Sequence, residues 1–238
     1  MSQEQALEII QKIFQAIFEN DNPFSLEEIK DFFAFDLCLP EMVKDSITNQ
    51  LTWVNPCRNK AFITNFNMQK KDREEGWMRE KQDIHNLKEL LTLWEDVNLM
   101  TTERVYDSEN VSESDTIYRC ENIFHSSDCS DSKNLVFCES CGKSEFLLAS
   151  FRSGSCNFCI RVFDSSGCSN SYQVICSNKI MHSFFIQDCF QLYECMFCAH
   201  IANKRFCIAN MQFEEEEYYQ IKREIIRWIL KKWRCKNK

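Results

Sequence analysis

Residues 105–128 read VYDSEN VSESDT IYRCEN IFHSSD, and they open a run of six-residue blocks that continues to Cys207 without insertion or deletion. The first and fourth positions of these blocks hold almost only Cys, Ser, Val, Ile and Leu. A fixed short period is typical of a solenoid, because each repeat is too small to bury its own apolar face and must stack on its neighbours. The sequence therefore predicts a repeat architecture over residues 104–210.

The first and fourth positions of each block are predicted to point inward. Neither carries a charge between Val105 and Cys198. Of the 12 cysteines between Val105 and Cys207, 11 occupy these two positions, leaving only Cys176 outside. Inward positions three apart fit neither a flat strand, whose period is two, nor a helix, whose period is 3.6. The sixth position is rich in Asn and Asp, which turn a chain at low cost. The predicted fold class is therefore mainly β, a single-stranded β-solenoid (β-helix) that turns a corner every few residues.

The length of one coil has two interpretations. Cys120, Cys138 and Cys156 recur at a spacing of three blocks, which favours three blocks per coil, whereas Cys129 and Cys141 recur at a spacing of two blocks. With roughly 4.8 Å between stacked coils, the rod would be roughly 29 Å long for three blocks per coil or roughly 43 Å for two. Three blocks per coil is taken as the expectation.

The repeat resembles several known solenoids. Inward Ser or Cys at every third position resembles the tight solenoids of beetle antifreeze proteins, and the period of six resembles hexapeptide-repeat left-handed β-helices. The Asn134–Phe137 stretch resembles pentapeptide-repeat proteins. Residues 105–213 are also similar to Cys-rich uncharacterised repeat proteins of uncultured bacteria, in which a run such as Cys207-Ile208-Ala209-Asn210 ends the array. These resemblances cover under half of the chain and imply a fold without a known activity.

Composition restricts the compartment and the partners. The chain has 238 residues, no evident signal peptide in its first 20 residues and no run near the ~18 apolar residues of a membrane span. A cytoplasmic location is expected, so the 15 cysteines are interpreted as buried thiols instead of disulfides. The net charge is −8, and only residues 211–238 are basic, with 8 Lys and Arg against 5 Asp and Glu. Nucleic acid is therefore not an expected partner.

Residues 1–103 are predicted to form an α+β region that covers the open end of the solenoid. An apolar stripe predicts a helix over residues 3–19, and a capping box of Ser25 and Glu28 opens a second helix that ends near Phe35. The alternation from Met42 to Val54 predicts a short hairpin. A third helix is expected over residues 83–97, with one apolar face made of Leu87, Leu90, Leu91 and Trp94.

Residues 211–238 are predicted to form an amphipathic helix from Glu214 to about Lys236. Its four N-terminal Glu and its C-terminal Lys and Arg match the helix dipole. We expect it to pack along the solenoid or to cap the last coil. The alternative is that Trp228, Trp233 and the basic residues dock on a partner or on an anionic membrane surface.

Two cysteine pairs carry the sharpest chemical pattern. Cys138-x2-Cys141 is followed by Cys156-x2-Cys159, and four thiolates in two close pairs can hold Zn²⁺. All four residues, however, occupy inward positions of the repeat, and any repeat with inward positions three apart produces C-x2-C wherever it uses Cys twice in succession. They are predicted to be structural thiols, and no metal ligand, cofactor or catalytic residue is assigned. A zinc-ribbon-like module remains the alternative.

Three histidines suggest a second alternative. His125, His182 and His200 lie in the third or sixth positions of the blocks and are expected to point outward. A β-helix enzyme of the carbonic anhydrase or acyltransferase type would need His from neighbouring coils, and only a coil of three blocks would put His182 and His200 on adjacent coils. They are interpreted as surface histidines.

The sequence as a whole favours a non-catalytic scaffold or protein-interaction module within a larger assembly or homo-oligomer. A protein partner or a second copy is expected, no membrane span is expected, and a small-molecule ligand is left open. Exposed aromatic side chains mark binding surfaces. The outward-pointing aromatics predicted to form that surface are Phe124, Phe158, Phe163, Phe184, Phe185, Phe190 and Phe197.

Overall fold

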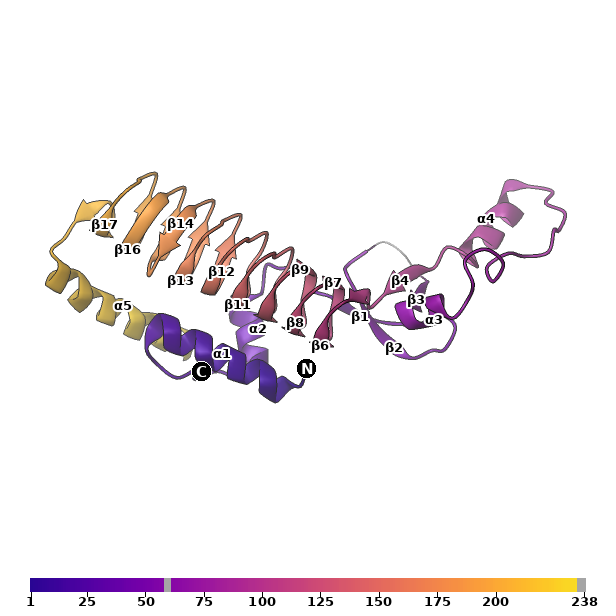
Figure 1. The fold of residues 1–238 in the computed structure, drawn as a ribbon, viewed down its shortest axis with the longest axis horizontal. Coiled ribbons are helices and arrows are strands. Elements are labelled where there is room, and N and C mark those ends of the chain that lie inside the picture. The colour runs from indigo at the N-terminus through magenta and orange to yellow at the C-terminus, as the bar shows by residue number, and fades with distance from the viewer. Residues whose placement is uncertain (58–60, 235–238) are drawn as a thin grey trace.

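The computed structural model describes residues 1–57 and 61–234, with side chains through residue 231. It is a β-solenoid of about nine coils, with helices along one side and a smaller α+β region at its first coils (Figure 1). The elements outside the solenoid are α1 (Gln3–Phe18), α2 (Leu26–Phe33), β1 (Glu41–Lys44), β2 (Leu51–Val54), β3 (Phe62–Thr64), α3 (Asn65–Gln69), α4 (Leu87–Glu95), β4 (Met100–Thr102) and α5 (Glu215–Arg234).

The solenoid strands are short and pair in parallel with the coils before and after them. They are β5 (Val105–Tyr106), β6 (Glu109–Ser112), β7 (Asp115–Tyr118), β8 (Glu121–Phe124), β9 (Ser127–Ser130), β10 (Lys133–Val136), β11 (Glu145–Leu148), β12 (Asn157–Phe163), β13 (Ser169–Ile175), β14 (Asn178–Met181), β15 (Phe184–Gln187), β16 (Phe190–Ala199) and β17 (Arg205–Ile208). A last strand, β18 (Met211–Gln212), folds back antiparallel on β17. The predicted mainly β solenoid is thus confirmed.

One coil contains two blocks, so the expectation of three blocks per coil is wrong. Leu135 pairs with Leu147 and Leu147 pairs with Cys159, and the same step of two blocks runs from β5 to β17. Each coil therefore has four inward side chains, two from each of its two blocks. The cysteine spacing was misleading because Cys occurs at all four inward positions, so several multiples of three appear between cysteines.

The corners of the coil explain the period of three. Every third residue from Asp107 to Ala209 has a positive φ, between 45° and 63°, and Gly167 is the one glycine among them. An L-residue in this conformation costs roughly 1–2 kcal/mol, less for Asn and Asp. Stacking of equivalent corner side chains on successive coils offsets this cost. The amides of Asn110, Asn122 and Asn134 form a hydrogen-bonded ladder, and the rings of Phe146 and Phe158 stack with centroids 4.4 Å apart.

The inward positions confirm the predicted two-column pattern and explain its preference for Ser and Cys. The Ser144 hydroxyl accepts a hydrogen bond from the N–H of Cys156 in the next coil at 3.1 Å and donates one to the Gly142 carbonyl at 3.0 Å. Cys141 uses its Sγ–H similarly, toward the carbonyls of Glu139 and Ser150. A tight corner leaves backbone groups facing the core, and small polar side chains satisfy them without adding volume.

A second core lies outside the solenoid, between one of its faces and the helices. The second residue of alternate blocks points outward on this face and is buried under α1, α2 and α5: Phe124, Val136, Leu148, Ile160, Tyr172, Phe184, Met196 and Ile208. From the other side, α1 contributes Ile9, Ile10, Ile13, Phe14 and Ile17. Ribbons of α1 and α5 run along the solenoid in Figure 1. The helices therefore cover a side of the rod.

The N-terminal region differs in part from the prediction. α1, α2 with its Ser25–Glu28 capping box, and the hairpin of β1 and β2 all form as expected. However, α1 and α2 cover the side of the solenoid and not its open end, because the apolar face they need lies there. The strands β1–β4 lie at the first coils, where the Asn55 N–H donates to the buried Asp115 carboxylate, which also forms a bidentate pair with Arg104.

The C-terminal helix packs along the solenoid, as predicted. Tyr218, Ile226 and Ile229 are buried against it. Lys222 Nζ lies 2.7 Å from Glu194 Oε2, and the side chains of this pair are only 14% and 6% exposed. The pair joins α5 to the coil that carries β16. Trp233 lies in α5, but its side chain is outside the described residues.

The predicted surface aromatics divide into two groups. Phe124 and Phe184 are buried by the helices, so placing them on the contact surface was wrong: they point out of the solenoid but into the second core. Phe158, Phe163 and Phe185 are half-buried, and Phe190 and Phe197 are exposed. The exposed part of the set is thus small and belongs to the later coils.

Candidate functional site

The most prominent exposed feature is an excursion of the chain between β3 and β4, residues 70–99, which we call the arm. β3 and β4 pair directly in parallel, Phe62 with Met100 and Thr64 with Thr102, so the chain leaves after the last residue of β3 and returns beside its first residue. In Figure 1 the arm projects away from the body at the end opposite β17. Long connections in compact proteins are usually functional, and a crossover of about a dozen residues would suffice to join two neighbouring parallel strands.

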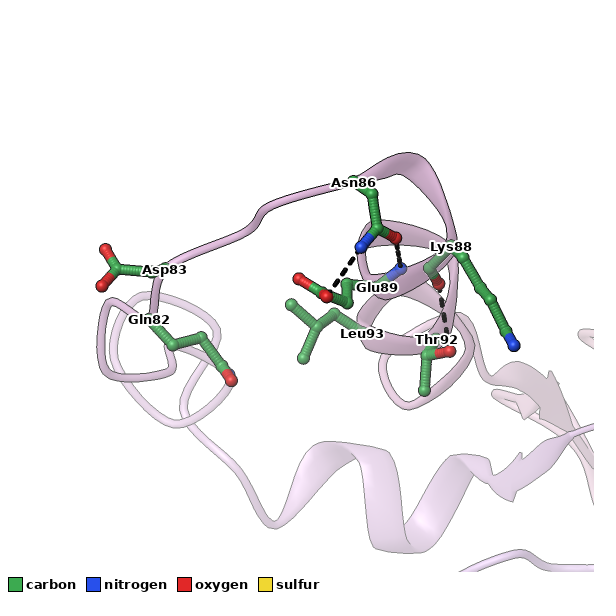
Figure 2. A pocket seen from close by; sticks show the side chains of 7 residues that line it. All are labelled: Gln82, Asp83, Asn86, Lys88, Glu89, Thr92 and Leu93. Atoms are coloured by element: carbon green, nitrogen blue, oxygen red, sulfur yellow. Dashed lines mark hydrogen bonds between the residues drawn. The ribbon is translucent and has the colours of Figure 1, made fainter.

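Local polar contacts hold the helix of the arm, α4, in place. Asn86 caps it: its Oδ1 accepts from the Glu89 N–H at 3.0 Å and its Nδ2 donates to Glu89 Oε1 at 2.7 Å, as Figure 2 shows. The other Glu89 oxygen accepts from the His85 N–H. Arg79 ties the start of the arm to the end of α4 through the Leu93 carbonyl and the Asp96 carboxylate. The helix is thus stabilised without a packed core.

The apolar face of α4 has no cover in the described part of this chain. The predicted helix over 83–97 forms over Leu87–Glu95, and none of its residues is buried. Leu87 is 69% exposed, Leu91 51% and Trp94 54%. Ile84, Leu90 and Val97 continue the same apolar surface. Exposed contiguous apolar surface in a folded protein marks an interaction site, because leaving it in water is unfavourable.

Two grooves flank α4. One, of about 510 Å³, is lined by Leu93 and by polar side chains from the segment before the helix and from the helix itself: Gln82, Asp83, Asn86, Lys88, Glu89 and Thr92 (Figure 2). The other, of about 360 Å³, is lined by the apolar side chains of Ile84, Leu90, Leu93, Trp94 and Val97 and by the polar residues 79–82. The second groove combines apolar side chains with charged and polar ones, as protein interfaces do.

A smaller aromatic cavity of about 260 Å³ lies between α2, the solenoid and α5. It is lined by Phe32, Phe35, Arg161, Tyr172, Gln173, Phe185, Trp228 and Ile229. Its charged group is already paired, since the nearly buried Arg161 forms a bidentate contact with Asp36 and donates to the Phe33 carbonyl and to Gln173. The cavity includes Trp228, which the sequence suggested as part of a docking surface. It is not an anion site, because the Arg161 guanidinium is already paired with Asp36.

The coil of two blocks does not stack the four cysteines of the zinc alternative on one another in the way the three-block expectation would. Cys138, Cys141, Cys156 and Cys159 occupy four different inward positions, whereas a coil of three blocks would have stacked Cys138 under Cys156 and Cys141 under Cys159. Burial raises the pKa of Cys138 and of Cys159, whereas hydrogen bonds from neighbouring thiols lower the pKa of Cys141 and of Cys156, so the four thiols do not share one tendency to ionise. Within residues 1–57 and 61–234, no group of three or more His, Cys, Asp and Glu is arranged to hold a metal ion.

The prediction of buried thiols holds for the inward columns of the solenoid but is wrong for Cys38 and Cys57, which are exposed, and Cys235 lies outside the described residues. The eleven solenoid cysteines in the inward columns are buried and unpaired as thiols, and Cys176, the one outside the columns, is exposed. Gly142, which follows Cys141 as in a zinc knuckle, lies in the flat face between Ser130 and Gly154 of the adjacent coils.

The three histidines lie on three different edges of the solenoid and do not meet. His200 is exposed, as expected of a surface histidine. His182 is half-buried beside Asn170. His125 is buried, so its prediction as a surface residue was wrong. It points out of the solenoid but is covered by Trp53, with ring centroids 5.0 Å apart, and its Nδ1 lies 2.9 Å from Glu113. Burial lowers its pKa, which the contact with Glu113 partly opposes.

Comparisons with family models, with curated proteins and with solved structures find no match to this chain. The fold therefore defines it as a β-solenoid protein with a projecting helical arm. No helix within the described part of the chain is long and apolar enough to cross a membrane. The sequence predicted α4 and its apolar face as part of the α+β region at the end of the solenoid, but did not identify that face as exposed.

Proposed function

We propose that this chain is a non-catalytic scaffold in a larger protein assembly, and that the arm is the contact through which it joins that assembly. The observation that carries this proposal is the uncovered apolar face of α4, formed by Leu87, Leu91 and Trp94. Elsewhere in the molecule an apolar helix face of this kind is buried, as α1 and α5 demonstrate. The solenoid supplies a stiff support, because successive coils are hydrogen-bonded to one another.

The difference in burial of apolar side chains between the body and the arm supports the same proposal. The large apolar residues inside the solenoid and under its helices are buried, whereas α4 retains its apolar residues in solvent at the end of a projection. A loop that keeps such residues exposed incurs a cost in solubility, which a binding role accounts for.

The test compares two substitutions at neighbouring positions of α4 in the full chain. Leu91→Glu places a charge in the apolar face, and Thr92→Glu places the same charge on the polar side of the helix. Native extracts of cells that produce each tagged protein are fractionated by size. Wild type and Thr92→Glu are expected to elute together as an assembly larger than the 28.3 kDa chain, and Leu91→Glu is expected to elute later. Identical elution of all three proteins would contradict the proposal.

A further inference from the structure

We infer that the partner of the α4 face is α4 of a second copy of this chain, packed antiparallel about a two-fold axis. This inference rests on the proposed interaction role of the arm and identifies its partner. A two-fold contact requires a surface that is complementary to itself. The α4 face meets this requirement in its apolar residues, in its charges and in its position on the molecule.

The charges flanking the apolar face are self-complementary in one orientation only. Lys88 and Glu95 are both exposed and lie seven positions apart, so they project from the same edge of the helix, two turns from one another. If two copies of Leu87–Glu95 overlap fully in antiparallel, position 88 of one lies opposite position 94 of the other, beside Glu95. Each Lys88 then meets a Glu95 of the other copy. In a parallel two-fold pair the edge that carries Lys88 and Glu95 lies on opposite flanks of the contact in the two copies, so neither Lys88 meets a Glu95.

The apolar residues match under the same overlap. Leu91 lies at the middle of α4 and would face Leu91 of the second copy across the axis. Trp94 of each copy would lie over the first turn of the other helix, near Leu87, and both side chains are more than half exposed in the single chain. Antiparallel helices also bring opposite ends of their dipoles together, which favours this orientation further.

The position of α4 allows two copies to meet without collision of their bodies. The helix lies at the far part of the arm, away from α1, α5 and the solenoid (Figure 1). A nine-residue helix offers a small interface, so we expect a weak, reversible dimer. The apolar groove lined by Ile84, Leu90 and Val97 adds to the surface that such a contact would cover.

The experiment is a charge swap measured by sedimentation of the purified full chain over a range of concentrations. Wild type is expected to dimerise reversibly. Lys88→Glu alone and Glu95→Lys alone each turn both reciprocal contacts into like-charge contacts and are expected to weaken the dimer about tenfold. The double variant Lys88→Glu/Glu95→Lys restores opposite charges in the antiparallel pair and is expected to regain most of the affinity.

Weaker helix formation cannot produce this pattern. A Glu at position 88 lies near the N-terminus of α4 and a Lys at position 95 lies at its C-terminus, so both substitutions improve the match to the helix dipole. Circular dichroism of each variant verifies that helix content is kept. Because α4 buries no side chain in the single chain, the variants are also expected to fold normally.

Three results would overturn the inference: a wild-type chain that stays monomeric at all concentrations, a dimer unaffected by Leu91→Glu, or a double variant no stronger than the single ones. The outcome remains separate from that of the proposed function. If purified protein is monomeric while the assembly in extracts still depends on Leu91, the partner is a different protein and the scaffold role stands. If neither contact depends on Leu91, both proposals are wrong.

Discussion

The solenoid and the arm place leucines in opposite surroundings. Leu147 is fully buried inside a coil, whereas Leu91 is half exposed on α4. Both segments are ordered by hydrogen bonds: the solenoid by pairing between coils, and α4 by its Asn86 cap and by Arg79. The difference shows that order and burial are separable here. The body buries its apolar side chains, and the arm leaves similar side chains in solvent, where the proposed function would use them for contact with another molecule.

The largest expected effect comes from truncating the same residue type in both regions. Leu147→Ala leaves a cavity inside a coil with no room to relax and should lower the free energy of unfolding by about 3–5 kcal/mol. Leu91→Ala should change it by less than about 0.5 kcal/mol, because its side chain contacts mainly water. Urea denaturation, at a protein concentration too low for dimerisation, measures the free energy of unfolding of both variants. Equal losses for the two variants would show that α4 packs against the body.

The next largest effect is the difference in stability lost when a buried ion pair of the body and an exposed ion pair of the arm are each broken. Lys222→Met leaves Glu194 buried without its cation and should cost about 3 kcal/mol. The arm pair of Arg79 and Asp96 is 41% and 58% exposed, so Arg79→Met should cost well under about 1 kcal/mol. Denaturation curves give both values. A double variant, Lys222→Met with Glu194→Gln, serves as the control and should recover much of the loss; no recovery would mean that Lys222 acts through its packing on Phe184 and Tyr218.

The sequence predicts those features of this structure that depend on residues close together in the chain. The inward columns, the buried cysteines and the helices were predictable, since each follows from a local period. The coil length required a different signal: Val136, Leu148 and Ile160 occupy the second position of every other block. The intervening blocks carry Ser130, Gly142 and Gly154 there. A coil of three blocks would not produce this alternation.

The candidate site was predictable only as a helix. An amphipathic stripe indicates that one face of a helix packs against another surface, but it does not indicate whether that surface belongs to the same chain. The stripes of α1 and α4 look alike in sequence, yet α1 packs on the solenoid and α4 buries none of its residues against the described part of the chain. Burial of His125 was missed for the same reason, because the covering Trp53 comes from a hairpin that only the tertiary fold brings near.

Removing a hydroxyl from the solenoid and from the arm should give a smaller difference in stability between the two regions. Ser144→Ala takes an acceptor from the Cys156 N–H and a donor from the Gly142 carbonyl inside the solenoid, which should cost about 1–2 kcal/mol. Thr92→Ala removes an exposed hydroxyl from α4, where Ala is the better helix former, so stability should stay the same or rise slightly. Thermal denaturation of both variants is the measurement. A neutral Ser144→Ala would show that the inward hydroxyls fill space without satisfying the corners.

The smallest expected effect is a pH dependence at the junction between the hairpin and the first coils. Burial lowers the pKa of His125 below its ordinary 6.5, and Lys30 adds to this, while Glu113 opposes it. A histidine with a lowered folded-state pKa contributes stability above pH 6.5, and that contribution declines as the pH falls through the folded-state value. The unfolding free energy of wild type should therefore fall below pH 6.5 more steeply than that of His125→Gln. His85→Gln, at an exposed histidine of the arm, is the matched control, and parallel curves for wild type and His125→Gln would exclude His125 as the source.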